Sequence, residues 1–412
     1  MREKGEPLHL VFATDAFITT DMGGAERVLW EQARRLAKRG HQVRVVAGCP
    51  AGRFREPEVR EGVAVRYFPR DERGALAHLV TAYRNCRAAL RRLGREGPVD
   101  VLSTHLPLAG FAAMAPPRPL PAPAVINFHA PWDQEFRTKV AGAGGRLAGA
   151  ALQAFARRVL QAFTLRRSEG VVCLSAFMRE EAARLASLRG KRVAVIPGGV
   201  DCERFAPGPE KAGPRASLGL PQRGTLLLTV RRLTPRMGLE HLLQAFREVA
   251  GEFPQAHLLV AGEGPLRSVL EGGIRDGGLT GRARLLGFVP EEDLPILYRA
   301  ADLFVLPTAA LEGFGMATLE ALASGLPVLA TPVGGTLEIL RDLSGPFFTE
   351  DASPAALARG LRRFLAMPAG EREAWGLRCR EHAAARYAWE RVIPQLEAYF
   401  AGAVSRRGNG IA

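Results

Sequence analysis

The sequence predicts an α/β protein built from two doubly wound, mostly parallel sheets, one in each half of the chain. Its 412 residues exceed what a single hydrophobic core usually serves and suit two domains. In both halves, short apolar runs alternate with helical patterns, which is the order that strand–helix–strand units produce. Residues 205–224, which are rich in proline and glycine, separate the halves and predict a linker.

Composition narrows the class of protein further. Hydrophobic residues make up 47% of the chain and charged residues 24%, which is typical of a soluble globular protein. No apolar run approaches the roughly 18 residues that a membrane-spanning helix needs. The five cysteines are odd in number and lack the spacing of a metal site, so we expect reduced thiols in a cytoplasmic protein.

The net charge of +14 is concentrated in the first half of the chain. Residues 1–205 contain 33 lysines and arginines against 20 acidic residues, whereas the remainder contains 23 against 22. A general preference for arginine would have raised the net charge of both halves. The excess of positive charge in the first half therefore predicts an anionic partner for that half. Membrane surface, acidic acceptor and nucleic acid are the candidates. Nucleic acid is disfavoured because the chain lacks basic platforms interleaved with aromatic residues.

The first half is expected to begin with a strand at residues 8–13, a turn through Gly23–Gly24 and a helix at residues 25–39. Further strands are expected at residues 41–46, 63–68, 99–104, 125–128, 170–175 and 193–196. His129 directly follows one of these strands, at the carboxyl end where parallel sheets hold ligands. We therefore treat His129 as a candidate site residue.

A basic amphipathic helix is expected within residues 137–167. Its apolar stripe consists of Leu152, Phe155, Ala156, Val159, Leu160 and Phe163. We expect this stripe to pack on the N-terminal sheet, although basic amphipathic helices also lie on membranes.

The second half repeats the alternation, with strands expected at residues 225–230, 257–261, 284–286, 303–306 and 328–330. Gly262 and Gly264 stand where a dinucleotide-binding fingerprint would begin. Arg267 occupies the place of its third glycine, so no NAD site is predicted.

The stretch at residues 311–331 is the most informative part of the chain. Glu312 precedes Gly313–Phe314–Gly315, a helix is expected to begin near Met316, and Glu320 lies about one turn inside it. A glycine loop that opens a helix presents backbone N–H groups and the positive end of the helix dipole, which suit a phosphate. Ionised carboxylates accept hydrogen bonds, and sugar hydroxyls donate them. The stretch therefore predicts a site for a ligand with both phosphate and hydroxyl groups.

The spacing Glu-x7-Glu in EGFGMATLEALASG resembles the signature of the retaining glycosyltransferases of family 4, which have the two-domain GT-B fold. The resemblance implies that Glu312 meets the donor sugar and Glu320 the ribose of the nucleotide. It also places Gly313, Phe314, Gly315 and Met316 in the donor site.

Other segments resemble the same family, from Gly23 to about Tyr399. Gly23 and Gly24 match a GG-x-E-R loop that faces the donor phosphates. His129 matches an FH-x-PW motif whose histidine lies near the reacting sugar. Backbone near Phe288 is where the base would sit.

An arginine-rich loop, RRLTPRMG, follows the first strand of the second half. Arg232 matches an arginine that neutralises the donor diphosphate in the family, and such cations stabilise the charge that develops on the leaving group. The family has a lysine where this chain has Met237, and we expect Arg236 to replace it.

The resemblance implies a GT-B fold whose two Rossmann-like domains face each other across a cleft. The acceptor domain would comprise residues 1–205 with C-terminal helices at about 388–412 that cross back to it, and the donor domain residues 206–387. The expected enzyme is a metal-independent retaining hexosyltransferase that acts on a nucleotide-diphosphate sugar and a glycan or lipid-linked hydroxyl. Glu312, His129 and Arg232 would be its catalytic residues.

Such an enzyme would serve cell-envelope or polysaccharide biosynthesis in the cytoplasm, with peripheral attachment at the inner face of the plasma membrane. Two other functions stay open: a GT-B nucleotide-sugar epimerase, and a non-enzymatic protein that binds anionic surfaces. The Glu-x7-Glu element and the GG-x-E-R loop favour a glycosyltransferase over these two alternatives.

Overall fold

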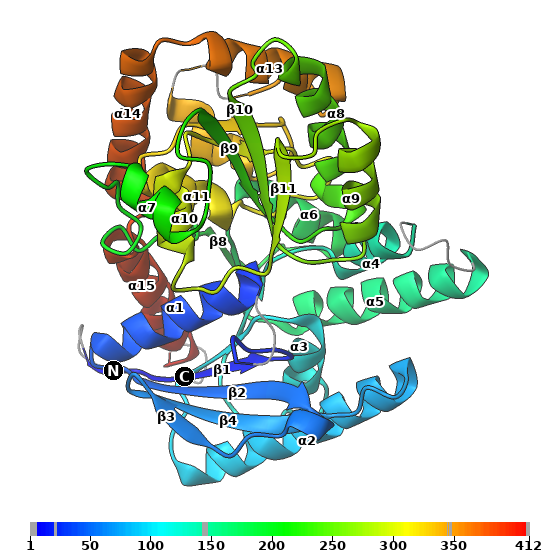
Figure 1. The fold of residues 1–412 in the computed structure, drawn as a ribbon. Helices are drawn as coiled ribbons and strands as arrows, with labels where there is room; N and C mark the ends of the chain where they lie inside the picture. The colour runs from blue at the N-terminus through cyan, green and yellow to red at the C-terminus, as the bar shows by residue number, and fades with distance from the viewer. Residues whose placement is uncertain (1–5, 20–22, 142–146, 344, 346–347, 409–412) are drawn as a thin grey trace. The chain divides into compact units, whose positions relative to one another are not determined.

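The computed structural model describes residues 6–19, 23–141, 147–343, 345 and 348–408. The chain divides into two compact units (Figure 1). The first comprises Met1–Arg137, Arg146–Pro197 and Glu390–Ala412, and the second Thr138–Gly145 and Gly198–Trp389. The main division falls before Gly198 rather than after Phe205, because Gly198 packs on Phe314 and the Phe205 ring lies 5.8 Å from that of Tyr298.

The first unit contains one eight-stranded sheet in the order β3-β4-β2-β1-β5-β6-β7-β8. Its strands are β1 (His9–Thr14), β2 (Gln42–Pro50), β3 (Glu58–Arg60), β4 (Val63–Arg70), β5 (Val101–Thr104), β6 (Ala124–Phe128), β7 (Gly170–Cys173) and β8 (Arg192–Val195). All are parallel except β3, an antiparallel edge strand that the sequence did not predict. The strand order reverses between β1 and β5, so ligands are expected at the carboxyl ends of these strands.

Helices cover the sheet of the first unit. They are α1 (Gly24–Lys38), α2 (Ala75–Glu96), α3 (Pro107–Met114), α4 (Trp132–Ala141), α5 (Leu147–Arg167), α6 (Ala176–Leu185) and α15 (Trp389–Gly408), with a short 3-10 turn at Ala51–Arg53. The apolar faces of α2, α3 and α5 join β1, β5 and β6 in one hydrophobic core. This core is what fixes the carboxyl edge of the sheet in place.

The packed face of α5 differs from the predicted stripe. Leu152, Phe155 and Val159 are exposed, whereas Ala154 and Leu165 are fully buried. The physical reason is the close approach of α3, where a Cβ added to Gly110 would lie 3.5 Å from the Thr164 side chain. This contact involves the C-terminal part of α5, where the Phe163 ring also lies 5.5 Å from Phe111, whereas Leu152, Phe155 and Val159 lie in the exposed N-terminal part.

The second unit contains a five-stranded parallel sheet in the order β11-β10-β9-β12-β13. Its strands are β9 (Thr225–Val230), β10 (Ala256–Ala261), β11 (Ala283–Gly287), β12 (Leu303–Leu306) and β13 (Val328–Ala330). Its helices are α7 (Ala212–Ser217), α8 (Leu239–Ala250), α9 (Arg267–Asp276), α10 (Leu294–Ala300), α11 (Met316–Ala323), α12 (Thr336–Leu340), α13 (Pro354–Ala366) and α14 (Ala369–Tyr387), with 3-10 turns at Pro235–Met237 and Arg341–Leu343. The two parallel Rossmann-like sheets confirm the predicted fold class.

Two segments show how the chain connects the units. The expected linker at residues 205–224 instead contains α7, which is fastened by the buried Arg215 through an ion pair of 2.7 Å to Asp302. The last helix, α15, belongs to the first unit, as predicted for a helix that crosses back. Its Tyr399 hydroxyl donates to the Arg192 carbonyl at 2.6 Å, and the Phe400 ring packs edge-on against Phe12.

Candidate functional site

A buried ion pair lies at the carboxyl edge of the second sheet. Arg231, the first residue after β9, donates to Oε2 of Glu312 at 2.5 Å, and the Thr308 hydroxyl donates to the same oxygen at 3.0 Å. Burial alone would raise the pKa of Glu312, but Arg231, Arg236 and the Thr308 hydroxyl outweigh it and hold that pKa below its ordinary value. Glu312 is therefore a fixed carboxylate rather than a mobile surface group.

Only one oxygen of Glu312 is occupied by this network. Within the described residues, no hydrogen bond reaches Oε1 of Glu312. A carboxylate whose second oxygen is open accepts a hydrogen bond from a hydroxyl. The arrangement suits recognition of a polyol at this edge.

The glycine loop after Glu312 leads directly into α11. Gly315 has φ of +102°, and a Cβ there would lie 2.6 Å from the Thr336 hydroxyl, so this position requires glycine. Gly315 is also the N-cap residue of α11 and, as a glycine, has no side chain to cap the helix. The start at Met316 confirms the predicted helix boundary, and the uncapped end offers its dipole to an anion.

Glu320 lies deeper than Glu312. It is 2% exposed, and its Oε2 accepts a hydrogen bond of 2.9 Å from the Tyr298 hydroxyl on α10. Sequence reasoning found Glu320 but not Tyr298, which orients its carboxylate.

The arginine-rich loop contacts the Glu312 segment. Arg232 is exposed, whereas Arg236 donates to the Leu311 carbonyl at 2.7 Å. Met237 is buried and packs in the core of the second unit. The structure thus brings Arg231 and Arg236 to Glu312, and Arg231 is the residue that sequence reasoning missed. The available sequence signal was its position immediately after a predicted strand.

An exposed aromatic residue and two glycines complete this edge. Phe288 follows β11 and is 62% exposed, which is unusual for so large an apolar side chain. Gly262 and Gly264 have positive φ and abut the backbone of Arg231 and Leu233, where any Cβ would collide. These glycines are explained by that close approach alone.

In the first unit, His129 is paired with a second histidine. Its Nε2 lies 3.1 Å from Nδ1 of His105, which follows the neighbouring strand β5. Burial lowers the pKa of His129 to about 4, and burial with the proximity of His129 lowers that of His105 well below its ordinary value. Both imidazoles are therefore neutral at neutral pH. The sequence signal for His105 was its place directly after a predicted strand, and the structure shows that this strand pairs with the one before His129.

Asp15 and the Gly23–Gly24 turn lie at the same edge of the first sheet. Asp15 accepts hydrogen bonds from the N–H groups of Leu108 and Ala109 at 2.9 and 2.5 Å, at the start of α3. Burial nonetheless raises the pKa of Asp15 to about 6. Gly23 is the N-cap residue of α1, and a Cβ added to Gly24 would meet no atom of the described residues within 4 Å.

The predicted residues therefore gather as two groups, one in each unit. Gly23, Gly24 and His129 belong to the first sheet, and the others to the second: Arg232, Arg236, Phe288, Glu312, Gly313, Phe314, Gly315, Met316 and Glu320. In the described parts of the chain, no three His, Cys, Asp or Glu side chains are gathered as a metal would need. Across the same residues, every helix falls short of the length or apolar character that crossing a membrane requires.

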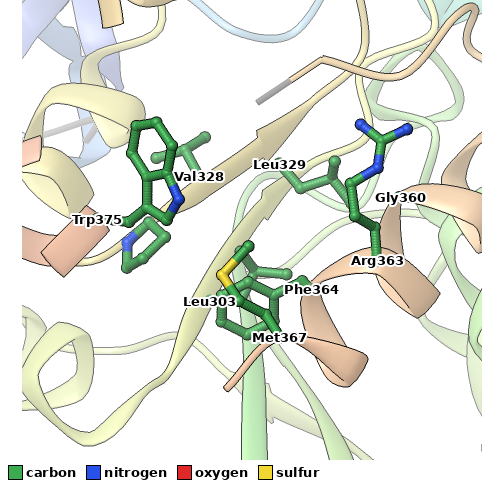
Figure 2. Close-up of a pocket in the computed structure, with 9 residues that line it drawn as sticks. Leu303, Val328, Leu329, Gly360, Arg363, Phe364, Met367 and Trp375 are labelled. Carbon is green, nitrogen blue, oxygen red and sulfur yellow. The ribbon is translucent and has the colours of Figure 1, made fainter. Parts of the chain in front are cut away.

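A small cavity in the second unit is separate from this edge (Figure 2). It is lined by apolar residues such as Phe364, Met367 and Trp375, with Leu303 and Val328 at the first positions of β12 and β13. Its volume of about 20 Å³ is that of a water-sized void. We assign it no function.

Comparison with known proteins identifies both halves. Residues 22–204 match the family model described as Glycosyltransferase Family 4, and residues 212–382 match Glycosyl transferases group 1. A D-inositol 3-phosphate glycosyltransferase from Geodermatophilus obscurus is 30% identical over 402 residues, which cover 93% of this chain and 85% of that protein.

Solved structures share the fold. Sucrose-phosphate synthase from Thermosynechococcus elongatus aligns over 97% of this chain and 100% of its own, with a TM-score of 0.80 at 21% identity. Anabaena HepE in complex with UDP-glucose aligns over 95% of this chain and 99% of its own, with a TM-score of 0.74 at 20% identity.

Proposed function

The chain belongs to the glycosyl transferases group 1 family of GT-B glycosyltransferases, and from that membership we propose that it is a retaining hexosyltransferase. The donor would be a nucleotide-diphosphate sugar and the acceptor a hydroxyl of a glycan or lipid-linked molecule. The observation that carries the proposal is Glu312, which Arg231 holds ionised with Oε1 open, directly before the uncapped N-terminus of α11. That edge offers a carboxylate for sugar hydroxyls and a positive site for phosphate.

We assign each group a role in donor binding. Glu312 accepts hydrogen bonds from the sugar, and Glu320, oriented by Tyr298, from the ribose. The N–H groups at Gly313–Met316 bind phosphate, with Gly23 and Gly24 as a second phosphate-facing turn. Phe288, with its exposed ring, contacts the base.

Cleavage of the donor leaves negative charge on the diphosphate. As the bond between the anomeric carbon and the phosphate oxygen breaks, its electron pair stays on the diphosphate, which Arg232 and Arg236 stabilise. The acceptor oxygen forms its bond on the same face, and its proton passes to a phosphate oxygen. His129, neutral because of its burial, contacts the reacting sugar. Arg232 and Arg236 supply the positive charge that the diphosphate needs, so we propose that transfer needs no metal.

The acceptor and location are a further part of the proposal. The outer face of α5 exposes Leu152, Phe155 and Val159, and the first half of the chain carries most of the net charge. An apolar stripe on a basic unit suits an anionic membrane. We propose a cytoplasmic enzyme of cell-envelope or polysaccharide synthesis that meets its acceptor at the inner face of the plasma membrane.

The test is release of nucleoside diphosphate from a panel of nucleotide sugars, with and without a membrane extract. UDP-glucose is the first donor to try, because the structurally similar HepE has been solved with it. D-inositol 3-phosphate is the first soluble acceptor to try, because a relative is named for it. NMR of the product establishes whether the anomeric configuration is retained. Conversion of the sugar without an acceptor would identify an epimerase, and binding to anionic surfaces without turnover would identify the non-enzymatic alternative.

A further inference from the structure

A large cavity lies in the first unit, at the opposite edge of the sheet from His129. Its volume is about 750 Å³, and it is bounded by the segments that lead into β6, β7 and β8 and by one face of α15. Pro123, Glu169 and Lys191 immediately precede these three strands. Because parallel strands share one direction, this amino edge is remote from the carboxyl edge that carries His129.

The charged residues that line the cavity are mostly basic. They are Arg118, Arg189, Lys191 and Arg192, with Glu169 as the single acidic member. Oε1 of Glu169 pairs with Arg118 at 2.6 Å, and its Oε2 accepts from the Ala124 N–H at 2.8 Å. One carboxylate, with both oxygens engaged, leaves most of the positive charge in the cavity uncompensated.

Two of the cations, Lys191 and Arg192, are held in place rather than free to disperse. Lys191 Nζ donates to the carbonyls of Arg166 and Ser168 at 3.0 and 2.6 Å, at the end of α5. The Arg192 guanidinium lies 4.7 Å from the centroid of the Tyr399 ring and directly on Gly402, where any Cβ would collide with it. Fixed side chains lose less entropy when a ligand binds, so the cavity is preorganised for an anion.

The positive groups also act on one another. Burial lowers the pKa of the Lys191 ammonium, the nearby Glu169 raises it, and Arg118 lowers it by a smaller amount. Arg118 Nε is buried without a hydrogen-bond acceptor in the described residues. Like charges held close together are costly, and a bound anion removes that cost.

The volume of the cavity and the chemistry of its walls indicate which class of anion it could hold. A cavity of about 750 Å³ falls within the range of small-molecule sites, roughly 300–1,000 Å³. One wall is apolar, made by Leu120, Pro121, Ala122 and Pro123, and the Tyr399 ring lines another. Arginine matches the oxygens of a phosphate in pairs. We propose that this amino-edge cavity is a second binding site, which takes a phosphate group carried on an organic body.

The phosphate could be carried by a soluble molecule or by a lipid headgroup, and the experiment separates the two. Inorganic pyrophosphate is titrated by calorimetry into a background that carries both Arg232→Gln and Arg236→Gln, which removes the two cations assigned to the donor diphosphate. Arg189→Glu is the test variant, because the Arg189 side chain makes no ion pair or hydrogen bond in the described chain and the fold does not depend on it. Arg118→Gln is a second variant. Arg179→Glu, an exposed arginine on α6 that does not line the cavity, is the matched control.

Pyrophosphate should bind, and Arg189→Glu and Arg118→Gln should each weaken binding at least about fivefold, while Arg179→Glu leaves it unchanged. Co-sedimentation with vesicles of phosphatidic acid, compared with neutral vesicles, then identifies the source. Loss of vesicle binding in Arg189→Glu but not in Arg179→Glu assigns a lipid headgroup, and vesicle binding equal in both assigns a soluble phosphate. No pyrophosphate binding, or equal affinity in the two charge-reversal variants, would overturn the proposal.

Discussion

Nδ1 of His105 lies 3.1 Å from Nε2 of His129, and the two histidines directly follow the carboxyl ends of the adjacent parallel strands β5 and β6. One imidazole must donate to the other, so each fixes the tautomer of its neighbour. Burial keeps both neutral, with the pKa of His129 at about 4. Sugar transfer at this edge would thus use an imidazole whose protonation does not change around neutral pH.

The first prediction concerns the acid side of the pH–rate profile. If neutral His129 supports transfer, turnover should stay constant from about pH 8 to pH 5 and fall only as the pH approaches 4. Initial rates across this range, with circular dichroism to confirm folding, provide the measurement. His129→Gln should abolish the acid limb along with most of the activity. A fall centred near pH 6.5, the ordinary histidine value, would contradict the assignment.

The second prediction concerns the Arg231–Glu312 pair. Arg231→Gln leaves a buried carboxylate without its cation and should lower the free energy of unfolding by about 3–5 kcal/mol. Urea denaturation measures this loss. The double variant Arg231→Met with Glu312→Gln should recover most of the stability, because no unpaired charge remains, yet stay inactive. A stable and active Arg231→Gln enzyme would show that Glu312 does not need this partner.

Local patterns were sufficient for most of the fold. The alternation of apolar runs and the start of α11 at Met316 were predicted from local patterns, whereas the return of α15 to the first unit was implied by the resemblance to GT-B glycosyltransferases. The pairs in the site were not, because Arg231 and Glu312 are 81 residues apart and His105 and His129 are 24 apart. Their meeting depends on which strands are neighbours, and a single sequence does not specify that order.

Errors in the fold prediction have a similar cause. Helix α5 has the right period, but it is buried mainly in its C-terminal part, where Gly110 and Phe111 of α3 meet Thr164 and Phe163. Residues 205–224 have the composition of a linker, yet the buried Arg215 ties α7 to Asp302. In both cases a tertiary contact overrides the local signal.

The third prediction separates the roles of the arginine-rich loop. Arg232→Ala and Arg236→Ala should each lower turnover at saturating donor at least about tenfold, on the order of 1.4 kcal/mol in the barrier. Met237→Ala should instead cost about 2–5 kcal/mol of stability, because its side chain lies in the core. Steady-state kinetics and urea denaturation on the three variants distinguish these effects. Wild-type turnover in Arg236→Ala would leave Arg232 and the α11 N-terminus to stabilise the leaving group alone.

The fourth prediction concerns the exposed stripe of α5. Phe155→Ser should weaken binding to anionic vesicles about tenfold or more, since burying a phenylalanine side chain is worth roughly 1.5–3 kcal/mol. Raising the salt concentration should weaken it further by screening the basic unit. Vesicle sedimentation is the measurement, with Val269→Ser on α9 as a control at another exposed apolar position. Equal binding by Phe155→Ser and wild type would exclude the stripe from the membrane contact.

The fifth prediction uses Asp15, whose pKa is raised to about 6 by burial although two N–H groups of α3 donate to it. A folded-state pKa above the unfolded value means that the native protein holds the proton more tightly. Asp15 therefore contributes stability at low pH, and this contribution disappears as the pH rises through 6. Between pH 5 and pH 7.5 the loss should be roughly 1–1.5 kcal/mol.

Asp15→Asn supplies the reference for this measurement, because asparagine has a similar shape and does not titrate. Its lost hydrogen bond shifts stability by a constant amount, and the buried histidines affect both proteins alike. Urea denaturation at pH 5, 6 and 7.5 gives the free energy of unfolding of both proteins. The value for wild type minus the value for Asp15→Asn should therefore fall as the pH rises. A difference that is flat, or that moves toward wild type, would mean that the α3 N–H groups and the nearby Arg70 stabilise the carboxylate more than burial destabilises it. Asp15 would then be a charged anchor of α3 rather than a protonated one.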